Sequence, residues 1–323
     1  MTRRGIAGIA AVFAMAVASA VLSGCFRGEG MTPLMLAAHD GSIPALKERI
    51  ASGDDLNARS RYGWTALMFA SWKGHREQVV ALLDAGADPN LISGDVPSRF
   101  ETVGGTPPTT ALRQAIESGH GDIARLLMNR GAKPDAGAAA LAGGKSDEAM
   151  LEELQRRGVD WNQPSPQTWH GTAVIAAAAR GNRRNLDWLL KHGADPNLVA
   201  GSTALKEAVN EDDPETVRFL LERGADPNVV YWSSNETALF TAVSKHVGDS
   251  HYNKNLEVIR LLLKHGADRN HRSTSDKLTA LEWVQRGREG TREAAAEATD
   301  PQVRKRLEVS MEHKDSVIRV LDS

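Results

Sequence analysis

Residues 62–90 read YGWTALMFASWKGHREQVVALLDAGADPN, which contains the signals for two short helices separated by a turn. Thr65 can begin the first helix, because its hydroxyl can accept a hydrogen bond from a first-turn amide that lacks a partner within the helix. Gly74 permits the turn, and valines and leucines at helical spacing give the second helix an apolar face. Gly86 suits a left-handed cap, and Pro89 prevents the helix from continuing. Two helices of this length cannot bury their apolar faces alone, so the segment needs similar neighbours.

The signals that start and end this segment recur along most of the chain. In five copies the closing glycine follows the starting threonine by 21 residues, as Gly86 follows Thr65. The starting threonines are Thr32, Thr65, Thr110, Thr172, Thr203, Thr237 and Thr279, and the closing glycines are Gly53, Gly86, Gly131, Gly158, Gly193, Gly224 and Gly266. This periodicity predicts an array of helix pairs in which each pair packs against the next.

The recurring segments resemble the ankyrin repeat. The resemblance rests on T-P-L and T-A-L helix starts, on G-H pairs at residues 74–75 and 119–120, and on G-A-D-P-N ends. It implies an all-α solenoid of about eight repeats, built from paired antiparallel helices joined by hairpin-type loops within residues 31–323. The expected repeats lie near residues 31–60, 61–93, 109–135, 136–165, 167–201, 202–235, 236–275 and 277–323. The histidine of the family's T-P-L-H motif is absent from every copy, so its inter-repeat hydrogen bonds are not assumed here.

Several regions depart from the repeated pattern, including eight extra residues at the helix–helix turn of the repeat at 236–275, and three of them bear most on the fold. Residues 94–108 are rich in Gly, Pro and Thr and are expected to form an enlarged loop. Residues 136–165 start with AGAAALAGGK, a sequence of small residues. We expect this helix to pack little and to be the weak joint of the array; alternatively, its small residues let neighbouring helices pack closely. Residues 287–315 are charged and alanine-rich, and residues 313–321 are the expected final helix of a polar-faced terminal repeat.

The N-terminus carries an export signal. In residues 1–24 two arginines precede an apolar run of small residues. The next residue, Cys25, completes an L-S-G-C motif that resembles the bacterial lipobox, which implies cleavage before Cys25 and acylation of that cysteine. Residues 25–30 would then be the acylated cysteine and a short linker, and two or more acyl chains would give a stable anchor. Phe26, in place of aspartate, implies sorting to the periplasmic side of the outer membrane of a Gram-negative cell. The alternative is a chance cysteine after a cleavable signal or an uncleaved anchor.

Composition and motifs argue against several classes of function. The net charge of −2 is too balanced for a protein that binds nucleic acid. The sequence contains no G-x-S-x-G, no H-E-x-x-H and no phosphate-binding glycine loop, so we expect neither an enzyme nor a cofactor. His246, Asp249 and His251 could bind a metal, but their spacing is not specific, and we expect no metal site.

The aromatic residues are the most informative candidates for function. They make up only 5% of the chain, yet several fall on expected loops or at the exposed end of a first helix. Arg, Tyr and Trp are the residue types that anchor protein interfaces. The candidate partner-binding residues are Arg61, Tyr62, Trp64, Trp72, Lys73, Trp169, His170, Tyr231 and Trp232. The alternative is that these rings are partly buried against adjacent loops. Trp188, Phe219 and Trp283 are instead expected in the core.

The sequence therefore predicts a monomeric, lipid-anchored periplasmic protein that binds a protein partner on its concave face. Inhibition of an envelope-active enzyme, as by an immunity protein, is a refinement that rests on family analogy alone. The alternative function is binding of cell-wall glycan (peptidoglycan), because Trp and Tyr also stack on sugar rings. The sequence identifies neither the partner nor the pathway.

Overall fold

The computed structural model describes residues 30–94, 108–165, 171–231, 235–245, 252–273 and 277–323. These residues form sixteen helices in eight consecutive pairs, and one isolated antiparallel bridge joins Tyr231 to Glu236. The predicted all-α architecture of about eight helix pairs is therefore confirmed. The chain divides into two compact units, Met1–Lys133 and Pro134–Ser323. Among the described helices, none combines the length and apolar character needed to cross a membrane.

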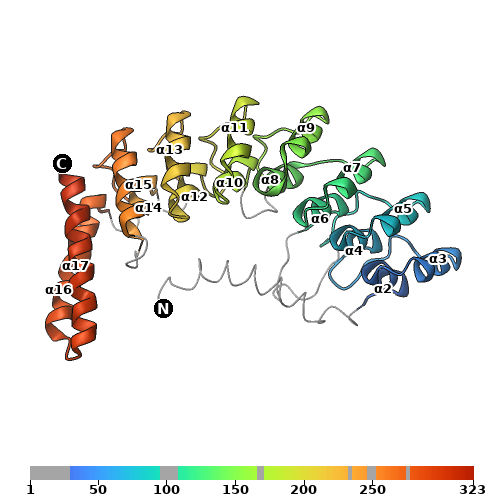
Figure 1. Ribbon diagram of the computed structural model, residues 1–323, viewed down its shortest axis with the longest axis horizontal. Helices are drawn as coiled ribbons and strands as arrows, with labels where there is room; N and C mark the ends of the chain where they lie inside the picture. The colour runs from blue at the N-terminus through green and yellow to red at the C-terminus, as the bar shows by residue number, and fades with distance from the viewer. Residues whose placement is uncertain (1–29, 95–107, 166–170, 232–234, 246–251, 274–276) are drawn as a thin grey trace. The chain divides into compact units, whose positions relative to one another are not determined.

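Unit 1 contains three helix pairs. They are α2 (Pro33–Asp40) with α3 (Ile43–Ala51), α4 (Ala66–Lys73) with α5 (Arg76–Asp84), and α6 (Ala111–Glu117) with α7 (Gly121–Asn129). The first helices stack in the order α2, α4, α6, and α3 packs on α5 (Figure 1). The fully buried Leu67 and Leu82 illustrate how both helices of one pair contribute to the core.

Unit 2 contains the other five pairs. They are α8 (Ala136–Lys145) with α9 (Glu148–Arg156), α10 (Ala173–Ala178) with α11 (Arg183–Lys191), α12 (Ala204–Asn210) with α13 (Pro214–Glu222), α14 (Ala238–Ser244) with α15 (Tyr252–Lys264), and α16 (Ala280–Glu297) with α17 (Pro301–Asp322). The first helices stack in chain order, and α13, α15 and α17 follow one another in the second row (Figure 1).

The recurring threonines begin the first helices as their positions predict. In α4, the Thr65 Oγ1 atom accepts a hydrogen bond from the amide of Met68 at 3.4 Å. Each of the other six starting threonines likewise caps the helix that follows it. The cap satisfies an amide that has no partner within the helix, which explains why threonine marks the start of each repeat.

Asparagines and histidines join successive repeats in place of the missing T-P-L-H histidine. The Asn197 side chain donates to the carbonyl of Gly224 at 3.0 Å and accepts from the amide of Asp226 at 2.7 Å. Asn90, Asn162 and Asn228 make the same pair of bonds to the following repeat. In unit 1, the Nε2 atoms of His75 and His120 lie 3.1 and 3.2 Å from carbonyl oxygens of the preceding repeat.

Helix α8 is densely packed, so the prediction that it packs little is wrong. Seven of its ten residues are buried. A Cβ atom on Gly143 would lie 2.4 Å from the carbonyl oxygen of Ala173 in α10, so the two helices approach at a distance that only glycine permits. The alternative interpretation, in which small residues allow close packing, is confirmed.

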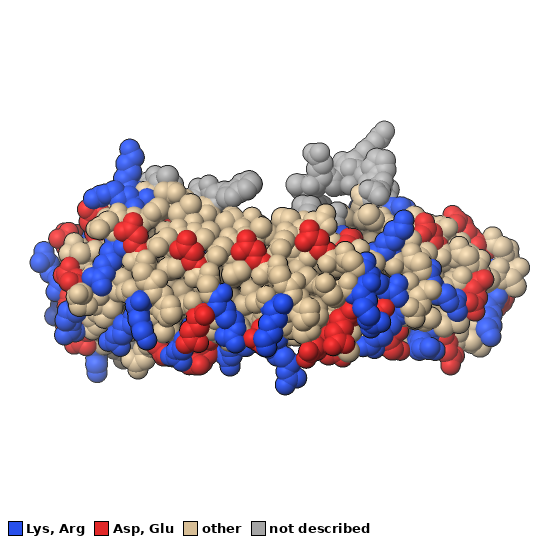
Figure 2. Space-filling model, turned by 90° about the horizontal axis from the view of Figure 1, so that it is seen from above, with Lys and Arg blue, Asp and Glu red and all other residues tan. Residues whose placement is uncertain are grey.

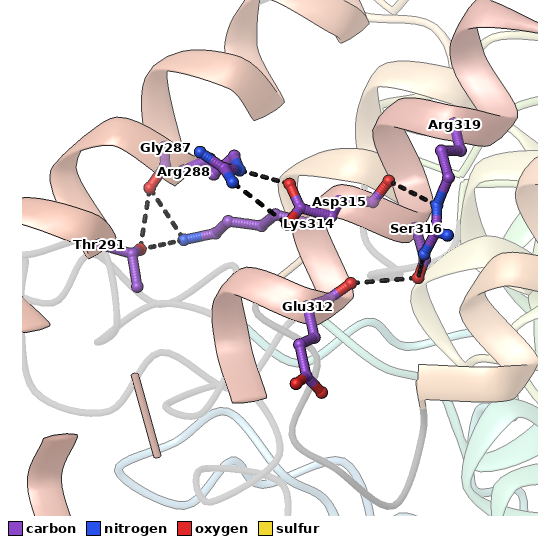
Figure 3. A network of polar contacts seen from close by, with 8 residues as sticks. All are labelled: Gly287, Arg288, Thr291, Glu312, Lys314, Asp315, Ser316 and Arg319. Atoms are coloured by element: carbon purple, nitrogen blue, oxygen red, sulfur yellow. Dashed lines mark hydrogen bonds and ion pairs between the residues drawn. The ribbon is translucent and has the colours of Figure 1, made fainter. Parts of the chain in front are cut away.

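The last helix pair is longer than expected. Helix α17 has 22 residues and begins at Pro301 after an Asp300 cap, rather than near residue 313. Its contact with α16 includes a polar network, in which the Lys314 ammonium donates to the carbonyl of Gly287 at 2.9 Å and to the Thr291 hydroxyl (Figure 3). Burial lowers the pKa of Lys314. Arg288 pairs with Asp315 beside it.

One buried hydroxyl in α4 gives a stability prediction. The Ser71 Oγ atom is fully buried and is one of three buried side-chain polar atoms among the described residues without a hydrogen-bond partner. Five other repeats carry a buried Ala, Val or Ile at this position, namely Ala38, Ile116, Ala178, Val209 and Val243. Because an unsatisfied buried hydroxyl costs free energy, Ser71→Ala should raise the free energy of unfolding by about 1 kcal/mol in urea titrations.

The control for this prediction is Ser42→Ala, because the Ser42 hydroxyl accepts from the Ala45 amide and caps α3. Its loss should lower the free energy of unfolding by about 1 kcal/mol. If Ser71→Ala is destabilising as well, the Ser71 hydroxyl has a partner in solution and the prediction fails.

Candidate partner-binding surface

A cluster of four rings gathers on α2 and α4 in unit 1. Trp64 precedes the cap of α4, Phe69 and Trp72 lie on α4, and His39 lies on the last turn of α2. The Trp64 ring centroid is 5.1 Å from that of Phe69 and 5.9 Å from that of Trp72, while His39 lies 6.0 Å from both Phe69 and Trp72. Phe69 is buried, whereas Trp64 and Trp72 are half-buried. We call these four residues the α4 aromatic cluster.

Cationic and aromatic side chains border the α4 aromatic cluster. The Lys73 ammonium lies 4.1 Å from the Trp72 ring centroid, a distance typical of a cation–π contact. Arg61 is exposed, and Tyr62 keeps 38% of its surface in solvent. We call the following five residues of repeat 2 the α4 surface: Arg61, Tyr62, Trp64, Trp72 and Lys73.

Backbone contacts of the loop before α4 position the first part of this surface. Ser60 and Trp64 exchange two hydrogen bonds, from the Ser60 amide to the Trp64 carbonyl at 2.9 Å and from the Trp64 amide to the Ser60 hydroxyl at 3.1 Å. Gly63 adopts a φ of 75° and packs so closely on the next loop that a Cβ atom would lie 2.6 Å from the Gly94 amide nitrogen. The loop that carries Arg61, Tyr62 and Trp64 is thus held at its base.

Five of the nine predicted partner-binding residues lie in the α4 surface, and the structure brings three of them, Trp64, Trp72 and Lys73, into contact. Trp64 and Trp72 are half-buried, and the Trp64 ring packs on Phe69. The alternative interpretation, in which these rings are partly buried, therefore also applies to them. Three further candidates, Trp169, His170 and Trp232, lie outside the described residues. So do the lipobox cysteine, the histidines considered for a metal and most of the expected enlarged loop, namely Cys25, His246, Asp249, His251 and residues 95–107.

The prediction of Tyr231 as a surface residue is wrong. Its side chain is only 5% exposed, and the Lys206 ammonium lies 3.8 Å from its ring centroid. The Tyr231 hydroxyl contacts the Glu236 carboxylate at 2.6 Å and the Thr241 hydroxyl at 2.9 Å. The bridge between Tyr231 and Glu236 folds the loop back, so the side chain lies between Lys206 of its own repeat and Glu236 and Thr241 of the next rather than pointing outward.

Of the three aromatic residues assigned to the core, only one is fully buried as predicted. Trp188 is 6% exposed, which confirms its placement, whereas Phe219 and Trp283 are half-buried. The Arg223 guanidinium carbon lies 3.6 Å from the Phe219 ring centroid and covers that ring. Trp161 was not singled out, but it is buried against Trp188 at 5.5 Å. It stands where other repeats have the proline of G-A-D-P-N, which is the signal that marks it as unusual.

One depression on the described surface of unit 2 is lined by charged side chains. A shallow depression of about 490 Å³ is lined by Gly144, Lys145, Ala179, Arg180, Gly181, Glu211 and Asp213. Burial, together with the charge of Glu207, raises the pKa of Glu211. The residues around this depression include no Ser, Cys or His that could act as a nucleophile or as a neutral base. In the part of the chain that the structure describes, no three His, Cys, Asp or Glu residues are grouped to hold a metal ion.

The charged side chains on the face drawn in Figure 2 alternate in sign and do not gather into one basic area. Many are paired in the described residues, as Arg218 is with Glu215 and Glu257. This arrangement matches solvated helix faces rather than a surface that tracks a nucleic-acid backbone.

Stacked helix pairs that present a preformed surface define a repeat protein of the binding type. The family model for ankyrin repeats in three copies matches residues 9–93 and 136–231, and the model for a single ankyrin repeat matches residues 234–274. The chain belongs to the ankyrin repeat family. Ankyrin repeats bind protein partners, and the fold is typically a non-enzymatic interaction scaffold.

Curated relatives match over only part of their length. Ankyrin repeat and SAM domain-containing protein 6 of Rattus norvegicus is 41% identical over 78 residues, which is 24% of this chain and 9% of the relative. The mitochondrial disaggregase of Bos taurus is 36% identical over 101 residues, covering 30% of this chain and 15% of the relative. The chain thus spans less than a fifth of the length of these two relatives.

Solved structures are similar over more of the chain. The ankyrin repeat domain of Bcl-3 is 24% identical, with a TM-score of 0.43, over 79% of this chain and 94% of that chain. A chain in the structure of the Bd0816 predatory endopeptidase from Bdellovibrio bacteriovorus in complex with immunity protein Bd3460 is 26% identical. Its TM-score is 0.49, and the match covers 60% of this chain and 100% of that chain.

Proposed function

We propose that this protein is a lipid-anchored periplasmic binding protein that holds a protein partner on the α4 surface. The observation that carries the proposal is a pair of half-exposed indoles in contact with each other, Trp64 on the buried Phe69 and Trp72 against His39. Partly exposed aromatic side chains on a rigid base are the usual anchors of protein interfaces. Because helix packing and loop contacts already hold these rings, little conformational entropy is lost when a partner binds.

The proposed location rests on the N-terminal sequence. The apolar run before Cys25, and Phe26 after it, match the pattern of an outer-membrane lipoprotein exposed to the periplasm. The role that we favour in this compartment is inhibition of an envelope-active enzyme, as by an immunity protein. It rests on analogy with other bacterial ankyrin-repeat proteins.

The binding surface is tested by affinity capture. Crosslinking of the acylated protein in envelope membranes, followed by mass spectrometry, should recover one stoichiometric partner. Trp64→Ala combined with Trp72→Ala should reduce that recovery at least thirtyfold, because truncating an interface anchor costs about 2 kcal/mol or more. Trp64 also contacts Phe69, and Trp72 contacts His39. This variant should therefore melt at a lower temperature, yet it should remain folded at 25 °C.

Two further variants separate lost binding from lost stability. Arg61→Ala combined with Tyr62→Ala removes exposed side chains and should weaken capture with a smaller change in melting temperature than the tryptophan variant. Val303→Ala removes an exposed apolar side chain from α17 in the other unit and should change neither. Undiminished capture by both the tryptophan and the Arg61–Tyr62 variants would place the interface elsewhere.

The anchor is tested by Cys25→Ser. This change removes the acylated thiol, so the protein should move from the membrane fraction to the soluble periplasmic fraction and lose the mass of its acyl chains. Phe26→Asp should keep the lipid but redirect the protein to the inner membrane, according to the sorting pattern. If the Cys25→Ser variant stays in the membrane, the N-terminal segment is an uncleaved anchor and the lipoprotein assignment is wrong.

Binding of cell-wall glycan is the alternative function, because half-exposed indole faces can also stack on sugar rings. Retention of the protein on purified sacculi, lost in the Trp72→Ala variant, would favour this alternative. The absence of retention would remove it.

A further inference from the structure

We infer that the partner engages the α4 surface through a segment in which a carboxylate side chain lies beside an apolar one, with Lys73 binding the carboxylate. This inference rests on the proposed function and adds the chemistry of the partner to it. The apolar side chain would cover the exposed parts of Trp64 and Trp72, next to the Lys73 ammonium.

Lys73 is a cation without a carboxylate partner among the described residues. Its ammonium lies over the face of the Trp72 ring, 4.1 Å from the centroid. Arginines elsewhere in unit 1 form ion pairs within the chain: Arg49 with Asp54 at 2.8 Å, Arg76 with Asp122 at 3.7 Å and Arg130 with Asp84 at 2.5 Å. Lys73 differs from them in keeping its charge available at the edge of the α4 aromatic cluster.

The acid at the matching position of the preceding repeat is already engaged. Asp40 ends α2 as Lys73 ends α4, and the Asp40 carboxylate lies 2.8 Å from the Nδ1 atom of His39. His39 in turn packs against the Trp72 ring. The α4 surface therefore presents an indole with His39 against it and Lys73 over its face.

Helix chemistry alone does not explain a lysine at this position. A cation near a helix C-terminus is mildly favourable. However, the residues at this register in other repeats are of every charge type, namely Asp40, Ser118, Arg180, Glu211 and Lys245. The helix end tolerates any of them, so this position is free to carry a residue that binds an anion, and Lys73 lies there over the face of the Trp72 ring.

The electrostatics favour an acidic partner over a basic one. A partner carboxylate can hydrogen-bond to the ammonium while that ammonium stays over the Trp72 ring, because lysine has three donors. The partner's apolar side chain would exclude water from the same place, and a lower local dielectric strengthens the ion pair. A basic segment would meet the like charge of Lys73, which selects against it.

A random peptide library tests the inference without knowledge of the natural partner. The detergent-solubilised full chain should select peptides in which Asp or Glu adjoins an aromatic or aliphatic residue. A selected peptide should bind Lys73→Glu at least tenfold more weakly, whereas Lys73→Arg should retain binding, because arginine keeps both the charge and the cation–π contact. Lys73→Met keeps the apolar stem and should remove most of the salt dependence of binding.

Lys47→Glu is the matched control, because Lys47 is an exposed lysine on α3 whose reversal should leave the selected peptides unchanged. The inference is overturned if the wild-type chain enriches no acidic peptide, or if Lys73→Glu selects the same peptides as the wild type. If the tryptophan variant loses envelope capture but Lys73→Glu keeps it, the proposed function stands and the inference fails. Lys73-dependent binding to purified sacculi instead would assign the anion to the glycan and overturn the inference for a protein segment.

Discussion

Replacing Gly143 with valine should lower the free energy of unfolding by about 3 kcal/mol or more. A Cβ atom at this position would lie 2.4 Å from the carbonyl oxygen of Ala173 and 2.8 Å from its Cα atom. Both neighbours belong to the backbone of α10, so no side-chain rotation can relieve the overlap. Helices α8 and α10 would have to separate, and buried apolar contacts along their length would be lost. Urea unfolding followed by circular dichroism measures the change.

Two other helical glycines are matched controls. Nothing lies within 4 Å of a Cβ atom on Gly290 in α16, so Gly290→Ala should gain up to about 1 kcal/mol from helix propensity. Gly144 is intermediate, because a Cβ atom there would meet the flexible Arg180 side chain at 2.8 Å and the Ala176 carbonyl oxygen at 3.2 Å. Equal stabilisation by Gly143→Ala and Gly290→Ala would show that α8 is loosely packed in solution.

The features predicted well from the sequence are those that one residue determines locally. A threonine such as Thr65 can cap a helix without help from the rest of the fold, and a glycine such as Gly86, with φ of 100°, meets a backbone requirement that few residues satisfy. Their regular spacing therefore predicted the helix pairs and their number. It also placed the α4 surface on one repeat.

The features predicted poorly depend on the neighbouring repeat. A run of small residues such as that in α8 fits either a loose helix or a close approach between helices, and only the distance to α10 distinguishes them. Likewise, Tyr231 is buried because Lys206, Glu236 and Thr241 surround it, and two of these contacts come from other segments of the array. No property of the tyrosine itself predicts them.

The sequence contains a local signal for the start of α17, at Asp300 and Pro301. The Asp300–Pro301 pair is typical of a helix start, because aspartate caps the helix and proline fits its first turn. The charged, alanine-rich composition of residues 287–315 obscured it. By contrast, no periodicity predicts that Lys314 lies between the two helices, since lysine is ordinarily an exposed residue.

Asn185→Asp should lower the free energy of unfolding by about 3 kcal/mol or more at pH 7. The Asn185 side chain is 2% exposed, and its amide nitrogen donates to the carbonyls of Gly143 and Ser146, each at 2.9 Å. These bonds satisfy carbonyl groups at the C-terminal end of α8, which have no amide partner within the helix. Aspartate would place a buried negative charge against those carbonyl oxygens, and an uncompensated buried charge is among the costliest single changes.

The pH dependence of stability distinguishes the cost of a buried charge at position 185 from the cost of losing the amide. Burial would raise the pKa of the new carboxyl above its value in the unfolded chain, so the destabilisation should shrink as the pH falls through that raised pKa. The protonated form can also donate one of the missing hydrogen bonds. Asn185→Ala should lose a smaller, pH-independent amount of about 1–3 kcal/mol, and Asn253→Asp, at an exposed site in the first turn of α15, should change little. If Asn185→Asp were no more destabilising than Asn185→Ala, and equally insensitive to pH, the amide could not be what holds the end of α8, and the close packing of α8 on α10 would have to account for it alone.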